Sequence, residues 1–488
     1  MKKGNFKSLI RSVAVTSALV LFSACQGGAP AGQADDCRLS FGQDGRFKIL
    51  QFTDVHINWE QREEYAKVHD HLAWMLDTEK PDLVVFTGDV VTGMQADSAW
   101  VDYLKPCDDR NVPFVVVYGN HDREQDLNVS QLASLITSHP SNINVTKDGF
   151  LTDQPVEIFS SDGSKVAAVL WCMDSGDYYQ NPRVSSKYGW IRPDQVEWYR
   201  KESMSYTDGN DGVPCPGYAF FHIPLPEYKE AFDAGNIVSG VRMEKECAPF
   251  FNSGLFSAFV ESGDVHAVFV GHDHGNDYVV TKDSIALCYG RFSGGKTTYN
   301  LIDMGTRVIE LTEGDYGLRT WVREKHGEPI QMDTIKVDLD YGLHKAVPAE
   351  GKRHGLKCTE FVGTDEFPQN VEKGRKAGDR IVAGPCMPKY YREDMHGYVM
   401  EGKLYVPESG LWLFHSTSFH AGILNIDGWE ISGIKRFQGE INLEKGFHDF
   451  KLVLAGNGKG ASSRQRFQWR KITDCAYKDV AEEFFYVE

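Results

Sequence analysis

The chain has 488 residues, of which 41% are hydrophobic and 12% aromatic, and it carries a formal net charge of −17 at pH 7. This composition excludes a largely disordered chain, and the length allows two or more domains with separate cores. Binding to a nucleic-acid backbone requires a basic surface, so the negative charge argues against a nucleic-acid partner, whereas divalent cations are compatible with it.

The N-terminus has the pattern of an export signal. It begins with four basic side chains, Lys2, Lys3, Lys7 and Arg11. The apolar stretch at 12–22 is too short to span a bilayer as a helix, and the residues Leu-Phe-Ser-Ala-Cys that end at Cys25 resemble a bacterial lipoprotein signal. The pattern predicts a signal peptide over 1–25, a linker over 26–45 and a protein of the bacterial cell envelope, lipid-anchored on the outer-membrane or periplasmic side or secreted. An ordinary cleavable signal is the alternative, and a lipid anchor is the only membrane contact expected.

Between residues 46 and 325, short apolar runs recur at intervals. Continuous apolar and β-branched runs of this length predict strands that are buried on both faces. The predicted strands are 47–52, 82–88, 114–119, 166–174, 218–223 and 265–271. Apolar residues at helical spacing from Tyr65 to Leu76 predict one helix, and another is predicted over 127–137. The pattern therefore predicts an α/β layered domain.

Five of these strands end in side chains that can bind a metal. They are Asp54 and His56, then Asp89, then Asn120, His121 and Asp122, then His222, and finally His272 and His274. Sites in open α/β sheets form beyond the carboxyl ends of the strands, so we expect these side chains to lie close together. Oxygen and nitrogen donors without thiolates suit zinc, iron(II), manganese or nickel, and an aspartate can bridge two cations. Because glycines flank His272 and His274, the two rings can reach two different metals.

The order D-x-H, G-D, G-N-H-D, H and G-H-x-H resembles the calcineurin-like metallophosphoesterase superfamily over residues 46–325. Longer stretches, such as PDLVVFTGDVV and FFHIPLPEY, resemble its purple-acid-phosphatase-like branch. The resemblance implies a layered β-sandwich flanked by helices. It also implies two divalent or trivalent transition-metal ions (Fe, Mn, Zn or Ni). The implied ligands are Asp54, His56 and His274 for the first ion, Asn120, His222 and His272 for the second, and Asp89 as the bridge.

The resemblance also assigns a role to His121, which would lie beside the substrate without binding metal. It would stabilise the phosphoryl oxygens or protonate the leaving group, and Asp122 would orient it. Purple enzymes place a tyrosine ligand three residues after the bridging aspartate, where this chain has Thr92, so the purple colour is not expected. Candidates for orienting the ligating rings are Asp273, Asn276 and Asp277, which could equally be solvated turn residues.

These assignments predict an exported enzyme that hydrolyses phosphate monoesters by a hydroxide bridging the two metals. One alternative is a phosphodiesterase acting on nucleotides, lipids or phosphorylated glycans. Another is a cell-surface glycan-binding protein whose phosphoesterase domain is an inactive scaffold. A DNA nuclease is disfavoured by the acidic charge. Arg291 could reach a substrate phosphate or form a surface salt bridge.

After about residue 330 the pattern changes to short alternating strands with turn signals. It predicts a connector over 326–355 and a separate all-β sandwich over 356–488. The stretch that begins LYVPESGLWLF resembles the anthrax protective-antigen-type β-sandwich, which implies a glycan as a possible partner. Trp412, Trp429 and Trp469 could stack on sugars, although packing in the core is expected.

Overall fold

The computed structural model describes residues 38–487, except for 180–182, 184–186, 211, 337–343, 349–352, 364–369, 386–395, 418–421, 434–437, 457–465, 472–473 and 475. The predicted signal peptide over 1–25, with Cys25, and most of the linker predicted over 26–45 lie outside the described residues. Within the described part of the chain, every helix is too short or too polar to cross a bilayer.

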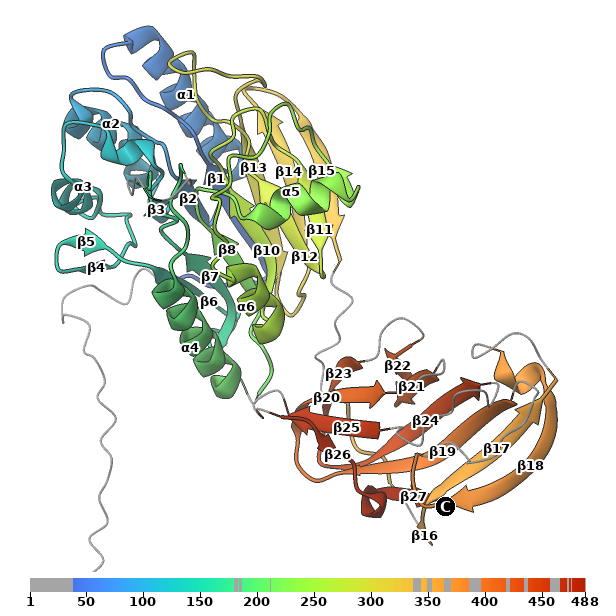
Figure 1. Ribbon diagram of the computed structural model, residues 1–488. Coiled ribbons are helices and arrows are strands. Elements are labelled where there is room, and N and C mark those ends of the chain that lie inside the picture. The colour runs from blue at the N-terminus through green and yellow to red at the C-terminus, as the bar shows by residue number, and fades with distance from the viewer. Residues whose placement is uncertain are drawn as a thin grey trace, which may run out of the picture. The chain divides into compact units, whose positions relative to one another are not determined.

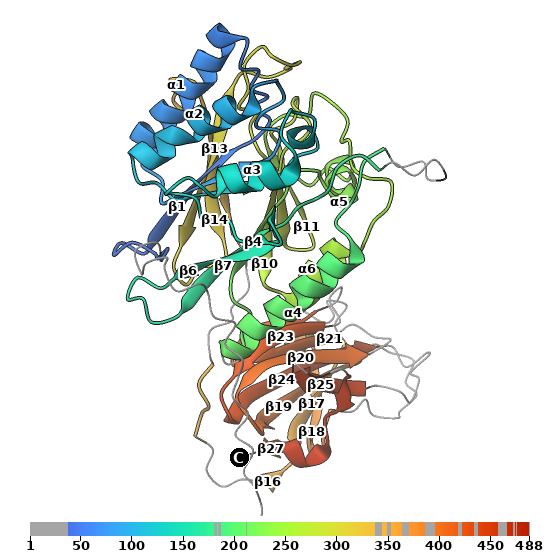
Figure 2. The same cartoon turned by 90° about the vertical axis from the view of Figure 1, so that its left-hand side faces the viewer.

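Two β-sheets packed face to face form the centre of residues 39–335, and helices cover their outer faces (Figure 1 and Figure 2). The first sheet has six strands in the order β15 (Pro329–Ile335), β14 (Leu318–Glu324), β13 (Gly305–Thr312), β1 (Arg46–Phe52), β2 (Leu83–Thr87) and β3 (Phe114–Val117). β1, β2 and β3 run parallel. Parallel neighbours need a crossover connection, which α1 (Arg62–Glu79) and α2 (Ala96–Asp109) provide.

The second sheet has seven strands, and its centre is also parallel. Their order is β6 (Gln154–Phe159), β7 (Val166–Cys172), β8 (Gly217–Phe220), β10 (Val265–Val270), β12 (Ile285–Tyr289), β11 (Val279–Lys282) and β9 (Ile237–Ser239). The helices between its parallel strands are α4 (Pro193–Gly209), α5 (Pro226–Asp233) and α6 (Leu255–Ser262). This part also contains a 3-10 turn (His121–Arg123), α3 (Val129–Ile136) and a hairpin of β4 (Thr146–Lys147) and β5 (Phe150–Leu151).

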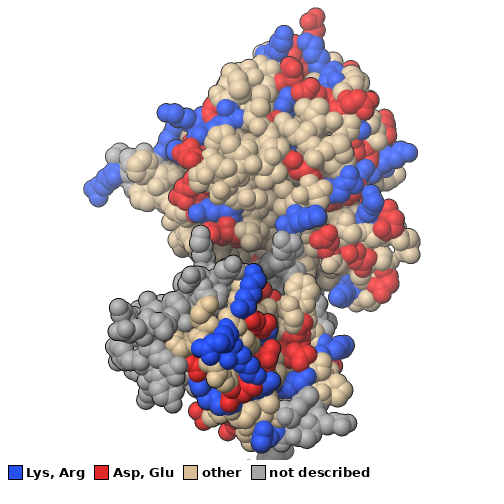
Figure 3. Space-filling model, turned by 90° about the vertical axis from the view of Figure 1, so that its right-hand side faces the viewer, with Lys and Arg blue, Asp and Glu red and all other residues tan. Residues whose placement is uncertain are grey.

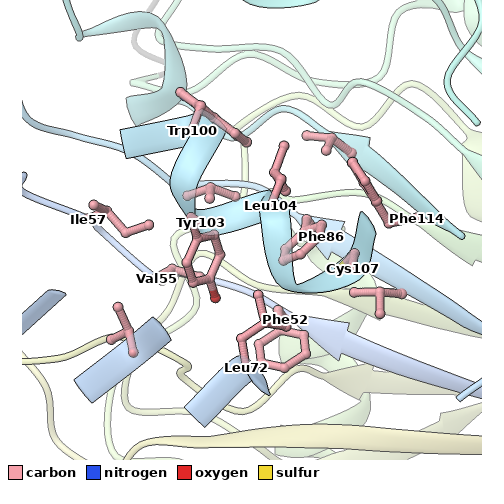
Figure 4. Close-up of a cluster of buried hydrophobic side chains, with 14 of the residues drawn as sticks. Phe52, Val55, Ile57, Leu72, Phe86, Trp100, Tyr103, Leu104, Cys107 and Phe114 are labelled. Atoms are coloured by element: carbon pink, nitrogen blue, oxygen red, sulfur yellow. The ribbon is translucent and has the colours of Figure 1, made fainter. Parts of the chain in front are cut away.

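The central strands are apolar on both faces because each face packs against another layer. In β1, Ile49 belongs to the core between the sheets and Leu50 to the core beneath the helices, since successive side chains of a strand point to opposite faces. Figure 4 shows the outer face of the first sheet, where Phe52 and Phe86 from neighbouring strands pack near Leu72 of α1. The prediction of an α/β domain with buried strands is confirmed.

The predicted strands correspond to β1, β2, β3, β7, β8 and β10, and the predicted helices to α1 and α3. The other helices and the antiparallel strands were not predicted. α2 contains Pro106, a residue that normally interrupts a helix. β15 alternates between exposed and partly buried residues and has no apolar run, yet it pairs with β14. The sheet therefore continues to residue 335, past the predicted boundary at 325.

The C-terminal part is built from β-sheets, as predicted. Its larger sheet contains β16 (Arg353–His354), β27 (Phe485–Val487), β19 (His396–Val406), β24 (Gly446–Gly456), β21 (Gly422–Ile426) and β22 (Trp429–Ser432), with β17 (Leu356–Val362) and β18 (Arg375–Val382) attached. The smaller sheet contains β23 (Gln438–Leu443), β20 (Gly410–Thr417), β25 (Arg466–Lys471) and β26 (Lys478–Asp479). Trp412 and Trp469 lie in the core with ring centroids 4.6 Å apart, whereas Trp429 is 51% exposed. Core packing is thus confirmed for two of the three tryptophans, and glycan binding stays a prediction.

The surface charge is mixed on the face shown in Figure 3. On the part of this face formed by residues 39–335, an uncharged area is bordered by interspersed acidic and basic side chains. On this part of the face, the described basic side chains are separated by acidic and uncharged ones and form no continuous basic surface of the kind that a nucleic-acid backbone requires. The absence of a nucleic-acid partner stays a prediction.

Candidate metal centre

The predicted ligands gather where the parallel strands of both sheets end. Asp54 and His56 follow β1, Asp89 follows β2, Asn120 follows β3, His222 follows β8, and His272 and His274 follow β10. All seven side chains are buried. Two groups have potential ligand atoms within 4.8 Å of one another: Asp54 with His56 and His274, and Asp89 with His222 and His272. Loops far apart in the sequence therefore bring together the side chains that were expected to meet.

The backbone at these positions adopts an uncommon conformation. Asp54, His56, Asp89 and His272 have positive φ values of 53°, 48°, 53° and 79°. Residues other than glycine reach this region at a cost of roughly 1 kcal/mol or more each, and such residues cluster at functional sites. Backbone hydrogen bonds hold the turns, since Asp54 N donates to Gly88 O and His56 N to Asp89 O. These hydrogen bonds join the loop after β1 to the loop after β2, and the two loops carry three of the ligands.

The first group contains two imidazole nitrogens that face each other. His56 Nε2 and His274 Nε2 lie 3.0 Å apart, and Asp54 Oδ1 is 3.6 Å from His274 Nε2. His274 Nδ1 is 2.7 Å from the Tyr299 carbonyl, which can only accept, so this nitrogen carries the proton. The lone pair of His274 Nε2 is therefore directed into the group, as in a metal ligand held by a backbone carbonyl.

The second group is joined to the first through one carboxylate oxygen. His222 Nδ1 donates to Thr87 O over 2.7 Å, which leaves its Nε2 facing Asp89 Oδ2 at 3.1 Å and His272 Nδ1 at 3.3 Å. Asp89 Oδ2 is also 3.7 Å from His56 Nε2. Asp89 Oδ1 accepts a hydrogen bond from the backbone of His121 over 2.8 Å. Asp89 Oδ2 therefore faces one ring of each group, as expected of a bridging ligand.

Asn120 provides an independent test of whether metals fit these residues. Its amide nitrogen donates to Tyr178 Oη over 3.0 Å, while its Oδ1 is buried and has no hydrogen-bond partner among the described residues. A buried acceptor without a partner is unfavourable by about 1–3 kcal/mol and is rare. A cation would satisfy this oxygen, and the surrounding donors are the carboxylates and imidazoles that transition metals bind. The residues present therefore fit two metal ions.

Burial and neighbouring charges set the protonation of the rings. Burial lowers the pKa of His56 to about 3 and also lowers that of His272, so both rings are neutral at pH 7. Burial likewise opposes the charged form of His222, but the Asp89 carboxylate outweighs it and raises the pKa of His222 to about 10. A proton and a metal therefore compete for His222 Nε2.

The structure contradicts the predicted pairing of His121 with Asp122. His121 Nδ1 lies 2.5 Å from Glu124 Oε2. Its ring is 5.3 Å from the His56 ring, so it lies beside the ligands but in neither group. The sequence His-Asp-Arg forms a 3-10 turn, His121–Arg123, and in this geometry side chains three residues apart lie on the same side. The neighbour in sequence, Asp122, therefore points elsewhere, and the prediction was wrong.

Asp122 instead fixes the backbone of the two loops that carry Asp89 and Asn120. It is fully buried, and its carboxylate accepts hydrogen bonds from four backbone N–H groups. The donors are Gly119 at 2.8 Å, Asp89 at 2.9 Å, Val90 at 2.8 Å and Val91 at 3.3 Å. Asp122 thus positions metal-binding residues through their backbone.

Changing Glu124 to Gln is expected to lower kcat for a poor leaving group more than for a good one. The Glu124 carboxylate holds the His121 ring by its contact with Nδ1. A poor leaving group depends most on a proton from that ring, so kcat for phenyl phosphate should fall about 10-fold further than kcat for p-nitrophenyl phosphate. Steady-state kinetics with both esters measure this ratio. Glu63→Gln, on the exposed first turn of α1, is the control. Equal losses for both esters would remove Glu124 from the mechanism.

The other predicted residues near the ligands have structural contacts. The carbonyls of Thr87 and Tyr299, and not Asp273, Asn276 or Asp277, hold the rings of His222 and His274. The three side chains accept hydrogen bonds from the backbone of the segment 241–247; the donors are Cys247, Met243 and Val241 respectively.

Arg291 also has a structural place, because it is 4% exposed and its guanidinium pairs with Asp277 at 2.5 Å and Glu324 at 2.6 Å. Of the two roles considered, the salt bridge is confirmed, but Arg291 forms it from a buried position and not on the surface.

Several residues that touch the site were not predicted from the sequence. Glu124 could have been found, because it stands one turn after His121. The roles of the Thr87 and Tyr299 carbonyls could not have been found, because every residue has a backbone carbonyl and the sequence does not mark these two. Tyr299 also stacks on His274 with centroids 4.2 Å apart, and Tyr188 meets the His272 ring edge to face at 4.5 Å.

The sequence is similar to known phosphoesterases. A family model described as calcineurin-like phosphoesterase matches residues 47–276. The chain is 30% identical over 346 residues to probable inactive purple acid phosphatase 14 of Arabidopsis thaliana, an alignment that covers 61% of this chain and 85% of that protein. It is 32% identical over 348 residues to probable inactive purple acid phosphatase 29 of the same plant, with 61% and 88% covered. It is 30% identical over 346 residues to phosphatase DCR2 of Saccharomyces cerevisiae, with 62% and 58% covered.

The comparisons contradict the predicted location in the bacterial cell envelope. The relatives named above are plant and yeast proteins, whose cells have no such envelope. The location predicted from the N-terminal pattern was therefore wrong, because a short basic and apolar leader is a compositional signal that does not identify the organism.

The family model ends at residue 276 and does not bear on the C-terminal sheets, so the protective-antigen-type resemblance stays a prediction. The layered fold of residues 39–335, the two buried candidate metal groups and the relatives at 30–32% identity agree with one another. The chain belongs to the calcineurin-like phosphoesterase family.

Proposed function

We propose that the protein is a phosphatase that hydrolyses phosphate monoesters with two transition-metal ions, each drawn from Fe, Mn, Zn and Ni. The observation that supports this most directly is the arrangement around Asp89 Oδ2, which faces His222 Nε2 of one buried group and His56 Nε2 of the other. Asp54, His56 and His274 would hold one ion, Asn120, His222 and His272 the other, and Asp89 both. When bound, two such ions lower the pKa of a water and neutralise charge on the phosphoryl oxygens.

The chain itself supplies orientation and a proton. Thr87 and Tyr299 hold the rings of His222 and His274 through their carbonyls, so that the Nε2 lone pairs stay directed at the ions. His121, partly exposed beside the ligands, would donate a proton to the leaving oxygen. Glu124 would hold the ring in place, since its Oε2 lies 2.5 Å from His121 Nδ1.

An inactive scaffold is the second candidate, because two of the relatives are named probable inactive phosphatases. The third is named a phosphatase. Asn120 Oδ1 is buried and has no hydrogen-bond partner among the residues that the structure describes. This favours a metal-loaded centre over a scaffold, because without a metal the burial of that oxygen would be unfavourable. Activity on diesters is a further alternative, which the same assay separates.

The purified full-length protein is expected to contain close to two metal ions per chain and to hydrolyse p-nitrophenyl phosphate faster than bis-p-nitrophenyl phosphate. Mass spectrometry of the metals and steady-state kinetics measure the two quantities. Removal of the ions by a chelator should abolish turnover, and addition of Mn²⁺, Zn²⁺ or Fe²⁺ should restore it. Bound metals without turnover would support the scaffold, and faster cleavage of the bis ester would support a phosphodiesterase.

A further inference from the structure

We infer that Tyr178 and Tyr188, here called the tyrosine pair, bind a planar aromatic leaving group of the phosphate ester. The inference rests on the proposed function and specifies its substrate class. The two residues face each other across an antiparallel bridge, and Tyr179 N donates to Lys187 O over 3.0 Å beside it. Their rings are stacked, with centroids 5.5 Å apart and an interplanar angle of 29°.

The tyrosine pair touches the second metal group and the candidate acid. The Tyr188 ring meets the His272 ring edge to face at 4.5 Å. Tyr178 Oη accepts a hydrogen bond from Asn120 over 3.0 Å, and the Tyr178 ring lies 6.1 Å from the His121 ring. The pair is therefore anchored to the ligands, and its position follows from theirs.

The geometry of phosphoryl transfer places the leaving group beside this pair. A proton donor must lie within hydrogen-bond reach of the leaving oxygen, so that oxygen lies next to His121. Whatever the oxygen carries must then extend within a few ångströms of His121, where the Tyr178 ring stands. A flat aromatic group is the occupant that stacks best on such a ring, whereas an alkyl group gains no ring stacking there.

The side chains next to the tyrosine pair are also aromatic. Tyr179 packs on Trp190 at 4.7 Å, and Trp190 packs on Phe251 at 5.1 Å. Phe251 is 45% exposed and the adjacent Phe250 is 77% exposed. Exposed aromatic groups gathered in one place mark binding surfaces more often than isolated apolar residues do.

Lys187 adds a positive charge to the tyrosine pair. Its Nζ donates to Tyr188 Oη over 2.8 Å and lies 4.7 Å from the Tyr188 centroid. A cation beside the rings favours electron-rich or anionic aromatic groups, such as a departing phenolate or a nucleobase. The charge therefore favours the same class of leaving group as the rings do.

The test compares kcat/KM for 1-naphthyl phosphate, adenosine 5′-monophosphate and glycerol 2-phosphate. In Tyr188→Leu and Tyr178→Leu the ratio of aromatic to glycerol ester should fall about 10-fold, the size of one lost stacking contact. Tyr178→Phe keeps the ring and should keep the ratio. Tyr405→Leu, in the C-terminal sheets where Tyr405 packs on Phe447, is the control. A fall only for the naphthyl ester identifies an aryl substrate, and a fall for both aromatic esters includes nucleotides.

An unchanged ratio in both leucine variants would overturn the inference, as would an equal loss with all three esters. Binding of benzylphosphonate and methylphosphonate, measured by calorimetry on the metal-loaded protein, separates this failure from failure of the proposed function. If the protein turned over phosphate esters but bound the two phosphonates equally well, only the proposed role of the tyrosine pair would be refuted. If the protein bound benzylphosphonate more tightly than methylphosphonate, lost this preference in Tyr188→Leu and showed no turnover, the aromatic binding site would stand and the proposed phosphatase activity would be refuted.

Discussion

Changing Asp89 to Asn is expected to remove at least one metal ion from the protein and to lower phosphatase turnover more than about 100-fold. Loss of a residue that merely supports a ligand already costs 10–100-fold, and Asp89 is proposed as the ligand shared by both ions. Asparagine keeps the shape of the side chain but loses its charge, and one oxygen becomes an N–H donor. At Oδ2, which faces His222 and His56, this donor would point at a cation.

The measurements are the metal content after gel filtration and the turnover of p-nitrophenyl phosphate. Asp97→Asn is the matched control, because Asp97 is an exposed carboxylate in the first turn of α2. It should retain both the metals and the activity. Two ions and full turnover in Asp89→Asn would refute the bridging assignment and the proposed mechanism with it.

Changing Asp122 to Ala is expected to lower the free energy of unfolding by about 3–5 kcal/mol, the usual cost of breaking a buried charged network. The substitution leaves the N–H groups of Gly119, Asp89, Val90 and Val91 without their acceptor. Each buried donor without a partner is unfavourable by about 1–3 kcal/mol, and some of the four would be reached by water. Urea unfolding followed by tryptophan fluorescence measures the change.

A matched control separates burial from hydrogen bonding. Asp126 also accepts two backbone hydrogen bonds, from Gln95 and Ala96, both over 3.0 Å, but its side chain is exposed. Asp126→Ala should cost only about 1 kcal/mol, like the loss of a helix cap, because water replaces the carboxylate. Equal losses in the two variants would show that the buried position of Asp122 contributes nothing beyond its hydrogen bonds.

The sequence determined much of the α/β part by itself, because its signals are local. A strand covered on both faces must be apolar along its length, and this made β1, β2, β3, β7, β8 and β10 recognisable. The polar residues after these strands were recognisable for the same reason, since they interrupt the apolar runs at the edge where sites form. All seven candidate ligands belong to this pattern, and the structure brings six of them together in two groups.

The partners of these residues were decided only by the tertiary structure. Asp122 adjoins His121 in the chain, yet Glu124 meets the ring, because a 3-10 turn separates the directions of neighbouring side chains. From the sequence, Arg291 was a candidate for binding a substrate phosphate. In the structure it is buried and pairs with Asp277 and Glu324. Composition determines which chemistry a segment can offer. Which atoms meet, including the oxygen of Asp89 that faces both groups, depends on distances across the two sheets, and no stretch of sequence encodes those locally.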